Sequence, residues 1–376
     1  MQDLGLYIHI PYCKRKCTYC NFHFSIQIDN KNKLIQCLLS EIKQRANEVN
    51  DSLVKSIYFG GGTPSILSEN ELGQIINQII KYYSIDSEVE ITLESNPDDL
   101  SSAYLKALST SEINRLSIGI QSFEDKELVW MNRAHDSAQS HHAIQASIEA
   151  GFNNISCDLI YGIPISSHEI WNKNIRHLID YNIPHLSCYA LTVEEKTKLY
   201  SDIKLNKTLA PDDQFTIEQM HILFELMDKN NYEAYELSSY CQNGFRSKHN
   251  SSYWQNKSYL GFGPSAHSFH NNRRRWNVAN NNIYIQSINS LIPYFDEETL
   301  SQRDRYNEYV MLNLRRIEGI DINLIQIEFN EYFNNCKSIL QQYYYDKYLI
   351  LEDNKYRLSN IGKIICDQII RNLFEL

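Results

Sequence analysis

The sequence predicts an α/β fold: a partial (β/α)6 barrel of the TIM type, followed by a smaller, mainly helical C-terminal domain. Short apolar runs alternate with helical stretches through the first half of the 376-residue chain, which is typical of parallel βα units. A doubly wound sheet has the same alternation. Glycine and polar residues gather where the runs end, as they do at the site-bearing ends of barrel strands, and this favours the barrel.

Six strands and two clear helices make up the first part of this pattern. The expected strands are residues 4–10, 54–60, 89–95, 115–121, 154–163 and 185–193. Each run is short, apolar and often β-branched, as strand residues are. The clearest helices are residues 33–46 and 137–151. The second should end at Gly151, because glycine readily adopts the left-handed backbone that closes a helix.

The alternation fades after about residue 200, and this change sets the expected domains. Residues 1–230 are predicted to form the barrel domain, with a helix near 212–229. Residues 231–300 are expected to be a connecting segment of loops and short strands. Residues 301–376 should form the C-terminal domain, in which 347–370 is a hairpin leading into a helix.

Charge and composition exclude several classes of protein. The net charge is −10 and no basic recognition helix is present, so we expect no nucleic-acid partner despite the hairpin beside helices. No apolar stretch approaches the length of a membrane span, and no basic region followed by an apolar run marks a secretion signal. A cytoplasmic location is therefore expected. Six of the nine cysteines are scattered and should be buried thiols.

The other three cysteines stand close together after the first strand. Cys13, Cys17 and Cys20 have the spacing C-x3-C-x2-C. Zinc sites usually take four ligands, so a zinc site would need His9 or His23 as the fourth. Thiolates also bind iron–sulfur clusters. Three cysteines on a [4Fe–4S] cluster would leave one iron open for another ligand.

This motif, placed after an N-terminal strand, resembles that of the radical S-adenosylmethionine (SAM) enzymes. The resemblance implies a [4Fe–4S] cluster on Cys13, Cys17 and Cys20. It also implies that SAM binds the open iron and is cleaved by an electron from the cluster to give a 5′-deoxyadenosyl radical. An electron donor such as flavodoxin or ferredoxin would then be a partner.

The same resemblance implies which residues hold SAM. The GGGTP segment, residues 60–64, looks like the glycine-rich segment of the family, where the backbone approaches the ligand closely. Tyr7 and Tyr19 flank the cysteines and would cover cluster and cofactor. The full set of SAM-binding candidates is Tyr7, Tyr19, Gly61, Gly62, Thr63, Glu94, Gln121, Arg133 and Asp158.

Longer motifs narrow the resemblance. The chain is similar to the oxygen-independent coproporphyrinogen III oxidase group in six motifs. In order along the chain they are YIHIPYC, GGGTPS, ESNPDDL, RLSIGIQSF, DLIYGIP and GFGPSAHS. The oxidases have a fourth cysteine two residues after the third, where this chain has Phe22. That departure makes the oxidase (dehydrogenase) activity an unfavoured alternative. A radical enzyme acting on a porphyrinogen or on another substrate stays open.

Haem chaperones related to this group contain an HNxxYW motif, which here spans residues 249–254. Imidazole is a common axial ligand of haem iron, and tyrosine and tryptophan offer flat apolar faces. His249, Tyr253 and Trp254 are therefore candidate haem residues, with arginines at 246 and 273–275 as candidates for the propionates. The resemblance implies haem as cargo and apo-haemoproteins as partners, including membrane respiratory proteins met at the membrane periphery. It also implies a homodimer.

Overall fold

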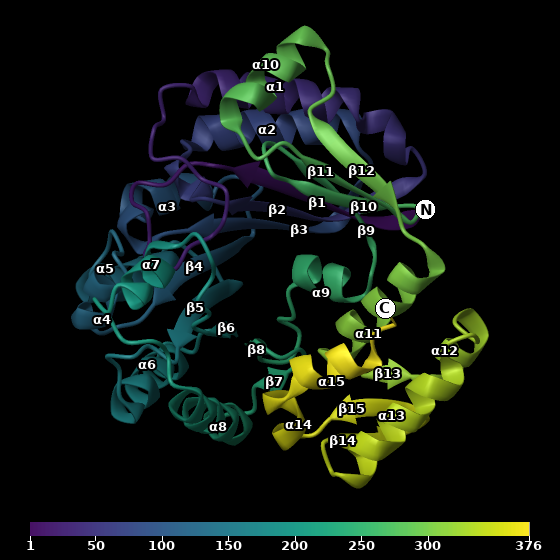
Figure 1. The fold of residues 1–376 in the computed structure, drawn as a ribbon. Coiled ribbons are helices and arrows are strands. Elements are labelled where there is room, and N and C mark those ends of the chain that lie inside the picture. The colour runs from purple at the N-terminus through teal and green to yellow at the C-terminus, as the bar shows by residue number, and fades with distance from the viewer. Residues whose placement is uncertain (376) are drawn as a thin grey trace.

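Six parallel strands form the wall of the partial barrel, which confirms the predicted fold class (Figure 1). The computed structural model describes residues 1–375. The barrel strands are β1 (Gln2–Ile10), β2 (Ser52–Gly61), β3 (Ile85–Ser95), β4 (Arg115–Gln121), β5 (Ile155–Tyr161) and β6 (His185–Ala190). Each strand pairs in parallel with the next. All six therefore end at one rim of the barrel.

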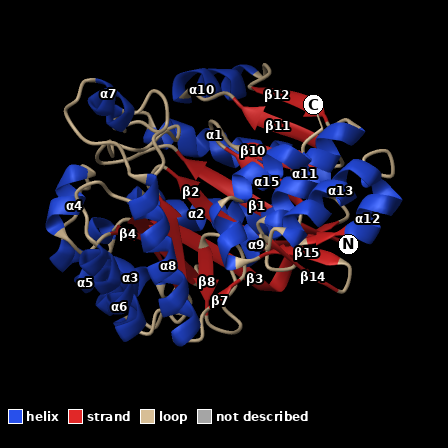
Figure 2. Ribbon diagram, turned by 60° about the horizontal axis from the view of Figure 1, so that its bottom comes forward, coloured by secondary structure: helices blue, strands red, loops and turns tan. Residues whose placement is uncertain are grey.

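Helices cover the outer face of these strands (Figure 2). They are α1 (Lys31–Gln44), α2 (Glu69–Tyr82), α3 (Ser102–Leu108), α4 (Asp125–Trp130), α5 (Ser137–Glu149), α6 (His168–Asp180) and α8 (Asp213–Lys229), with short 3₁₀ turns η1 (Ala46–Val49), η2 (Pro64–Ile66) and η3 (Pro97–Asp99). Helix α7 (Lys198–Lys204) lies at the rim instead, where the N–H of Leu199 donates to the carbonyl oxygen of Thr18. Local sequence sets their ends. Capping boxes at Ser68 and Asp136 begin α2 and α5. Gly151, with φ 95°, follows α5 as predicted.

Further strands continue the sheet beyond both edges of the barrel. Its order is β12-β11-β10-β9-β1-β2-β3-β4-β5-β6-β8-β7, twelve strands in all. The added strands are β7 (Glu233–Ala234), β8 (Ser239–Cys241), β9 (Ser258–Phe262), β10 (His267–His270), β11 (Arg273–Asn277) and β12 (Phe295–Thr299). Because an open barrel leaves two unpaired strand edges, this pairing satisfies backbone groups that would otherwise be exposed.

The barrel strands alternate between an apolar outer face and a polar inner face. In β3, Ile91 and Leu93 belong to the main hydrophobic core, whereas Thr92 and Glu94 occupy the alternate positions. Alternation with a period of two sends successive side chains to opposite faces of a sheet. The helices therefore cover the apolar side, and the polar positions of all six strands face the barrel interior.

The C-terminal part has its own hydrophobic core, built around Tyr306, Val310 and Leu340. Its helices are α11 (Gln302–Leu314), α12 (Ile322–Glu328), α13 (Phe333–Tyr345), α14 (Asn360–Ile364) and α15 (Cys366–Leu373). A small sheet of β13 (Ile320–Asp321), β14 (Leu349–Glu352) and β15 (Lys355–Leu358) includes the predicted hairpin. Within residues 1–375, every helix is too short or too polar to cross a lipid bilayer.

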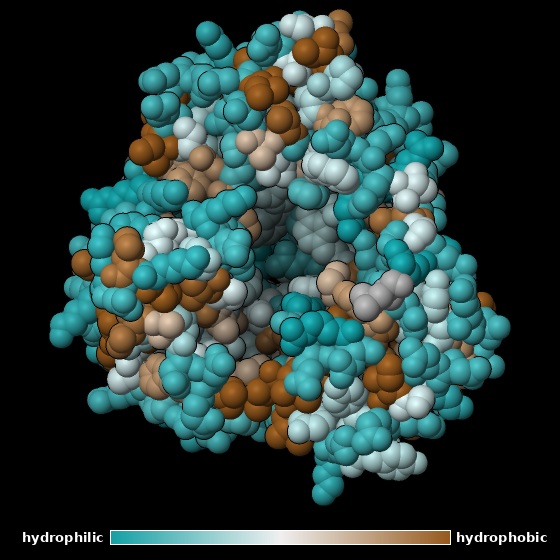
Figure 3. Space-filling view, in the orientation of Figure 1, coloured by the Kyte–Doolittle hydropathy of each residue, from teal (hydrophilic) through white to brown (hydrophobic). Residues whose placement is uncertain are grey.

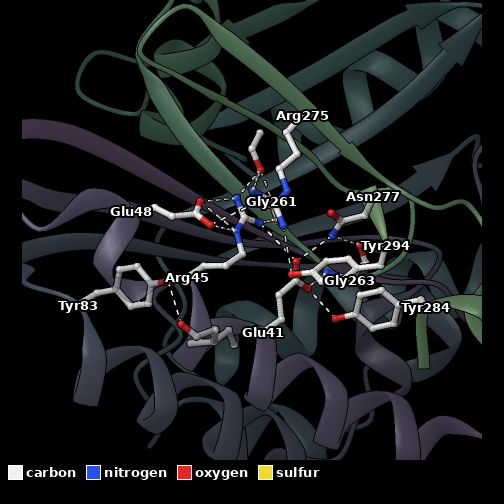
Figure 4. Close-up of polar contacts among 12 residues, drawn as sticks. Glu41, Arg45, Glu48, Tyr83, Gly261, Gly263, Arg275, Asn277, Tyr284 and Tyr294 are labelled. Carbon is white, nitrogen blue, oxygen red and sulfur yellow. Dashed lines mark hydrogen bonds and ion pairs between the residues drawn. The ribbon is translucent and has the colours of Figure 1, made fainter. Parts of the chain in front are cut away.

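A buried ion-pair network attaches α1 to the added strands (Figure 4). Glu41, fully buried on α1, accepts hydrogen bonds from Tyr284 Oη at 2.6 Å and from Asn277 Nδ2 at 2.9 Å. It also accepts one from the backbone N–H of Gly263 at 2.8 Å. Tyr284 lies on α10 (Asn281–Ser290). Arg45 completes the network by donating to Glu41 and to the carbonyl oxygen of Gly261.

Candidate functional site

The three clustered cysteines lie in the loop that follows β1. They are partly exposed, whereas the other six cysteines are buried, and no cysteine within residues 1–375 forms a disulfide. Two of the predicted SAM residues contact the thiols directly. Thr63 Oγ1 donates to Cys13 Sγ at 3.4 Å, and an Arg133 guanidinium N–H donates to Cys17 Sγ at 3.5 Å. Donors to sulfur stabilise the thiolate form that binds metal.

The three thiols do not form a single-ion site among the described residues. Among the described residues, no three His, Cys, Asp or Glu side chains converge closely enough to hold one ion. A [4Fe–4S] cluster needs no such convergence, because each thiolate binds its own iron. His9 could complete a zinc site only by losing existing contacts, since its Nδ1 bonds Tyr7 Oη and its Nε2 the carbonyl oxygen of His23.

The ionisation of the thiols is coupled to metal binding. Burial raises the pKa of Cys13 to about 11 and also raises the pKa of Cys20. The neighbouring cysteines add to both shifts because like charges oppose each other. Without metal, Cys13 and Cys20 are therefore neutral near pH 7, and binding a cluster to them releases protons.

Glycines bring the end of β2 against the cysteine loop. The N–H of Gly62 donates to the carbonyl oxygen of Ile10 at 2.9 Å. A Cβ on Gly62 would lie 2.6 Å from the carbonyl oxygen of Tyr12, and one on Gly61 would lie 2.6 Å from the His9 ring. Gly61 also has φ 114°, a conformation that side chains disfavour. Only glycine at both positions permits this close approach.

Two carboxyl groups face the interior below this rim. Tyr58 Oη donates to Glu94 Oε1 at 2.7 Å, and the N–H of Gly61 donates to Glu94 Oε2 at 3.2 Å. Burial raises the pKa of Glu94 to about 7. It also raises the pKa of Asp158 to about 6, although Ser187 and Arg115 oppose that shift. Burial therefore disfavours the ionised form of both carboxyls, and a cationic group bound beside them would restore that form and its hydrogen-bond acceptors.

Arg133 connects the cysteine loop to the ends of β3 and β4. Its guanidinium donates to Asn96 Oδ1 and to the carbonyl oxygen of Gly119, each at 2.8 Å. Its Nε is buried and has no partner within residues 1–375. A ligand carboxylate would satisfy this donor. Gln121 has φ 66°, a strained value for a residue with a side chain, as is common near functional sites.

The two predicted tyrosines lie on different sides of the cysteine loop. Tyr7 stacks on Tyr58, with ring centroids 6.2 Å apart, and faces the barrel interior. Tyr19 packs against the small apolar cluster that includes Leu128 and Met131. The structure therefore brings the cysteines, Thr63, Arg133 and Tyr19 together at the rim, with Tyr7, Glu94 and Asp158 deeper.

The HNxxYW motif lies on α9 (Lys248–Trp254), inside the ring of barrel elements (Figure 1). Ser247 caps this helix, and Glu90 accepts the backbone N–H groups of Lys248 and His249 at 3.1 Å each. In the space-filling view, the face shown is hollowed at its centre beside this helix (Figure 3). The motif is thus part of the barrel interior.

His249 is held tightly in this position. Its side chain is 1% exposed, its Nδ1 bonds Ser56 Oγ at 2.8 Å, and its Nε2 bonds Tyr253 Oη at 3.0 Å. Its ring stacks on Tyr58 at 4.9 Å between centroids. Burial lowers its pKa to about 3, so the imidazole is neutral. Neutral imidazole is the form that binds metals, but here one of the two hydrogen bonds would first have to break.

Three of the four predicted propionate-binding arginines already have ion-pair partners. Arg246 pairs with Glu233 and Glu318. In β11, Arg274 pairs with Glu308 and Arg275 with Glu48. Trp254 is half-buried at the end of α9. These arginines therefore anchor neighbouring elements in this conformation.

Several interior residues were missed from the sequence. They occupy the polar positions of the barrel strands: Ser56, Tyr58, Glu90, Thr92, Arg115 and His185. Arg115 is fully buried, and none of its side-chain nitrogens has a hydrogen-bond partner in the described chain. Glu90 Oε2 is 4.0 Å from Arg115 Nε. The alternation of apolar and polar residues along each predicted strand would have identified these positions.

Comparison with known proteins gives consistent results. Residues 7–183 match the model of the radical SAM superfamily. A heme chaperone HemW of Bacillus subtilis (strain 168) is 33% identical over 317 residues, covering 84% of each chain. The HemW of Lactococcus lactis subsp. lactis (strain IL1403) is 30% identical, covering 86% of this chain and 84% of its own.

A solved structure shares the fold. The radical SAM enzyme coproporphyrinogen III oxidase (HemN) of Escherichia coli superposes with a TM-score of 0.86, at 20% identity. The match covers 99% of this chain and 90% of the other. The architecture is therefore that of a known protein over almost the whole chain.

Proposed function

The chain belongs to the radical SAM superfamily, within the family of the HemW relatives, and we propose that it is a haem chaperone, which binds haem and delivers it to apo-haemoproteins. The observation that carries this proposal is the extent of the similarity. A HemW of Mycobacterium tuberculosis (strain ATCC 25618 / H37Rv) matches 99% of the chain at 26% identity. Phe22, in place of a fourth cysteine, also favours a chaperone over an oxidase.

Membership of this superfamily means that the chain carries a [4Fe–4S] cluster and SAM. We propose that Cys13, Cys17 and Cys20 hold the cluster. Arg133 and Glu94 suit the carboxylate and ammonium groups of SAM, because one offers a buried unpartnered donor and the other a buried acceptor. Gly61, Gly62 and Thr63 would shape the cradle. When bound to these cysteines, the cluster would supply an electron for the cleavage of SAM, and this chain's residues would bind, orient and shield the reactants.

The remaining SAM candidates fit the same chamber. Tyr7 and Tyr19 would cover the cofactor from two sides, while Gln121 and Asp158 would offer hydrogen bonds to its polar groups. Of these, Tyr7 and Asp158 project from the inner face of the barrel wall. A chamber with polar walls suits a charged cofactor, because it replaces the hydrogen bonds lost from water.

Within this function, we assign His249, Tyr253 and Trp254 to haem binding in the barrel interior. Haem iron would take His249 after release of Ser56 or Tyr253, and the aromatic rings would pack against the macrocycle. We further propose that the protein is cytoplasmic, forms a homodimer and takes electrons from a flavodoxin or ferredoxin. Its recipients would include respiratory haemoproteins of the membrane, and it would reach the membrane only by binding them. Its barrel domain would span residues 1–230, its connecting segment residues 231–300 and its C-terminal domain residues 301–376.

Haem titration of the anaerobically reconstituted protein tests this function. The wild-type protein should bind haem and develop a Soret absorption band. His249→Ala should weaken binding or shift the band, because an axial ligand is lost. The exposed His142 provides a matched control, and His142→Ala should bind like the wild type. Absence of haem binding by the wild-type protein, together with conversion of coproporphyrinogen III in the presence of SAM and a reductant, would refute the proposal.

A further inference from the structure

A groove of about 630 Å³ lies on the outer side of the cysteine loop. It is lined by residues 16, 20–27 and 195–196, so the cysteine loop forms one wall and the segment between β6 and α7 the other. The volume lies within the range of small-molecule sites. Cys20 is one of the lining residues. The groove therefore lies beside the cluster ligands and outside the barrel interior.

Its lining exposes large apolar side chains to solvent. Phe22 is 68% exposed and Ile26 is 62% exposed. Phe24 also lines the groove and is half-buried, with the Lys16 ammonium 6.0 Å from its ring centroid. Contiguous exposed apolar side chains usually mark a surface that another molecule covers. Two phenylalanine rings in one groove favour a flat apolar ligand.

His23 supplies the groove with a metal ligand. Its Nε2 bonds Asn281 Oδ1 at 2.8 Å, which places the ring proton on Nε2 and leaves a lone pair on Nδ1. Nδ1 has no hydrogen-bond partner within residues 1–375, unlike the ring nitrogens of His9 and His249, which are all bonded. An imidazole whose other N–H is held by an oxygen acceptor is the usual arrangement at a protein-bound metal.

Two cations complete the chemistry of the groove. Lys16 and Lys196 both line it, both are exposed, and neither forms an ion pair in the described part of the chain. They come from opposite walls. Lysine ammonium groups bind carboxylates as point charges. The lining thus combines a histidine, aromatic faces and two cations with one carboxylate, that of Glu195.

We propose that this groove is a surface haem site, in which His23 Nδ1 is the axial ligand and the two lysines bind the propionates. Phe22 and Phe24 pack against the macrocycle. This inference rests on the proposed chaperone function and adds a second location for the cargo. A haem here remains accessible from solvent, so a recipient protein reaches it without any rearrangement of the barrel.

The test is haem titration of the reconstituted full-length protein, followed by absorption spectroscopy. His23→Ala should weaken haem binding at the groove at least about tenfold, since the axial ligand is lost. The amount of haem bound per chain should fall and the Soret band should change, while the site at His249 still fills. His142→Ala should leave both unchanged. Circular dichroism and iron content serve as checks that His23→Ala retains its fold and cluster.

Lys196→Glu provides a second, independent variant at an exposed position. It should weaken binding of haem but not of haem dimethyl ester, because the ester has no propionate charge. If His23→Ala and Lys196→Glu both bind haem as the wild type does, the surface site is refuted. A loss confined to His249→Ala would also refute it and would place the haem inside the barrel. A wild-type protein that binds no haem would instead refute the chaperone function itself.

Discussion

Glu94 shows how a single residue ties the stability of the barrel to its chemistry. Its carboxyl faces the interior between Tyr58 and the N–H of Gly61. Burial raises its pKa from 4.5 to about 7. The folded protein therefore holds this proton more tightly than the unfolded chain does. The resulting stability is complete below about pH 4.5 and is lost as the pH rises through about 7.

Glu94→Gln should remove this pH dependence, because glutamine does not ionise. Relative to the wild type, the SAM-free variant should gain on the order of 3 kcal/mol of unfolding free energy as the pH rises from about 4.5 to about 8. Thermal unfolding across this range measures the difference. Asp86→Asn is the control, because Asp86 lies on the same strand outside the barrel chamber and its pKa is lowered by Lys55. Parallel curves of Tm against pH for Glu94→Gln and the wild type would contradict the prediction.

At the residue scale, the sequence predicted what depends on local spacing. The C-x3-C-x2-C motif and GGGTP came together because the chain places each at the end of a barrel strand. Burial and hydrogen bonding could not be predicted in this way. His249 is occupied at both nitrogens by Ser56 and Tyr253, and Ser56 lies 193 positions away in the chain. From the sequence, His23 was a candidate only for a zinc site. Its free Nδ1 became evident from the structure, in which Asn281 accepts the proton on Nε2.

At the element scale, α1 is attached to the second half of the chain by Glu41 and Arg45 (Figure 4). Both side chains are almost completely buried. Glu41 accepts four hydrogen bonds, from Arg45, Gly263, Asn277 and Tyr284. A buried carboxylate that is fully hydrogen-bonded fixes the position of the groups around it. We infer that it sets the position of α1 relative to strands β9 and β11, which flank β10 in the sheet.

Removing Glu41 should be strongly destabilising. Glu41→Ala removes the carboxylate that accepts hydrogen bonds from Arg45, Gly263, Asn277 and Tyr284, and leaves these buried donors without that partner. The change should lower the unfolding free energy by about 3 kcal/mol. Glu48→Ala is a matched control, since Glu48 also pairs with Arg45 but its side chain is 38% exposed. Because the Glu48 carboxylate reaches solvent, losing its pairs with Arg45 and Arg275 should cost less, on the order of 1 kcal/mol. Urea unfolding measures both, and similar small losses in the two variants would contradict this account.

Helices and strands could be predicted where apolar runs alternate with helical stretches along the chain. They could not be predicted where a strand or helix depends on a partner far away in the sequence. The six barrel strands were predicted because each is a short apolar run between helices. Strand β9 pairs with β1 in parallel across more than two hundred residues of sequence, and no local pattern specifies that partner. Helix α9 has a polar sequence, which predicted loops and short strands rather than a helix. Its helical form depends on the Ser247 cap and on Glu90, which lies on a different strand.

At the scale of the whole molecule, the cysteine loop is joined to several parts of the fold. Lys14 pairs with Asp98 and Asp99 after β3, and His23 bonds Asn281 at the start of α10. The inner side of the cysteine loop faces the glycine segment and the polar chamber. The outer side of the same loop, which carries Phe22, lines the groove. A cofactor and a cargo can therefore bind on opposite sides of one loop, and this arrangement suits a chaperone that must release what it carries.

The central claim is haem delivery, and a transfer experiment tests it most directly. Anaerobically reconstituted protein is loaded with haem, separated from free haem and mixed with an excess of an apo-globin, while absorption spectra are recorded. The account predicts that the Soret band of the loaded protein is replaced by that of the holo-globin. Failure of the protein to load haem, or formation of protoporphyrinogen from coproporphyrinogen III under reducing conditions with SAM, would contradict it.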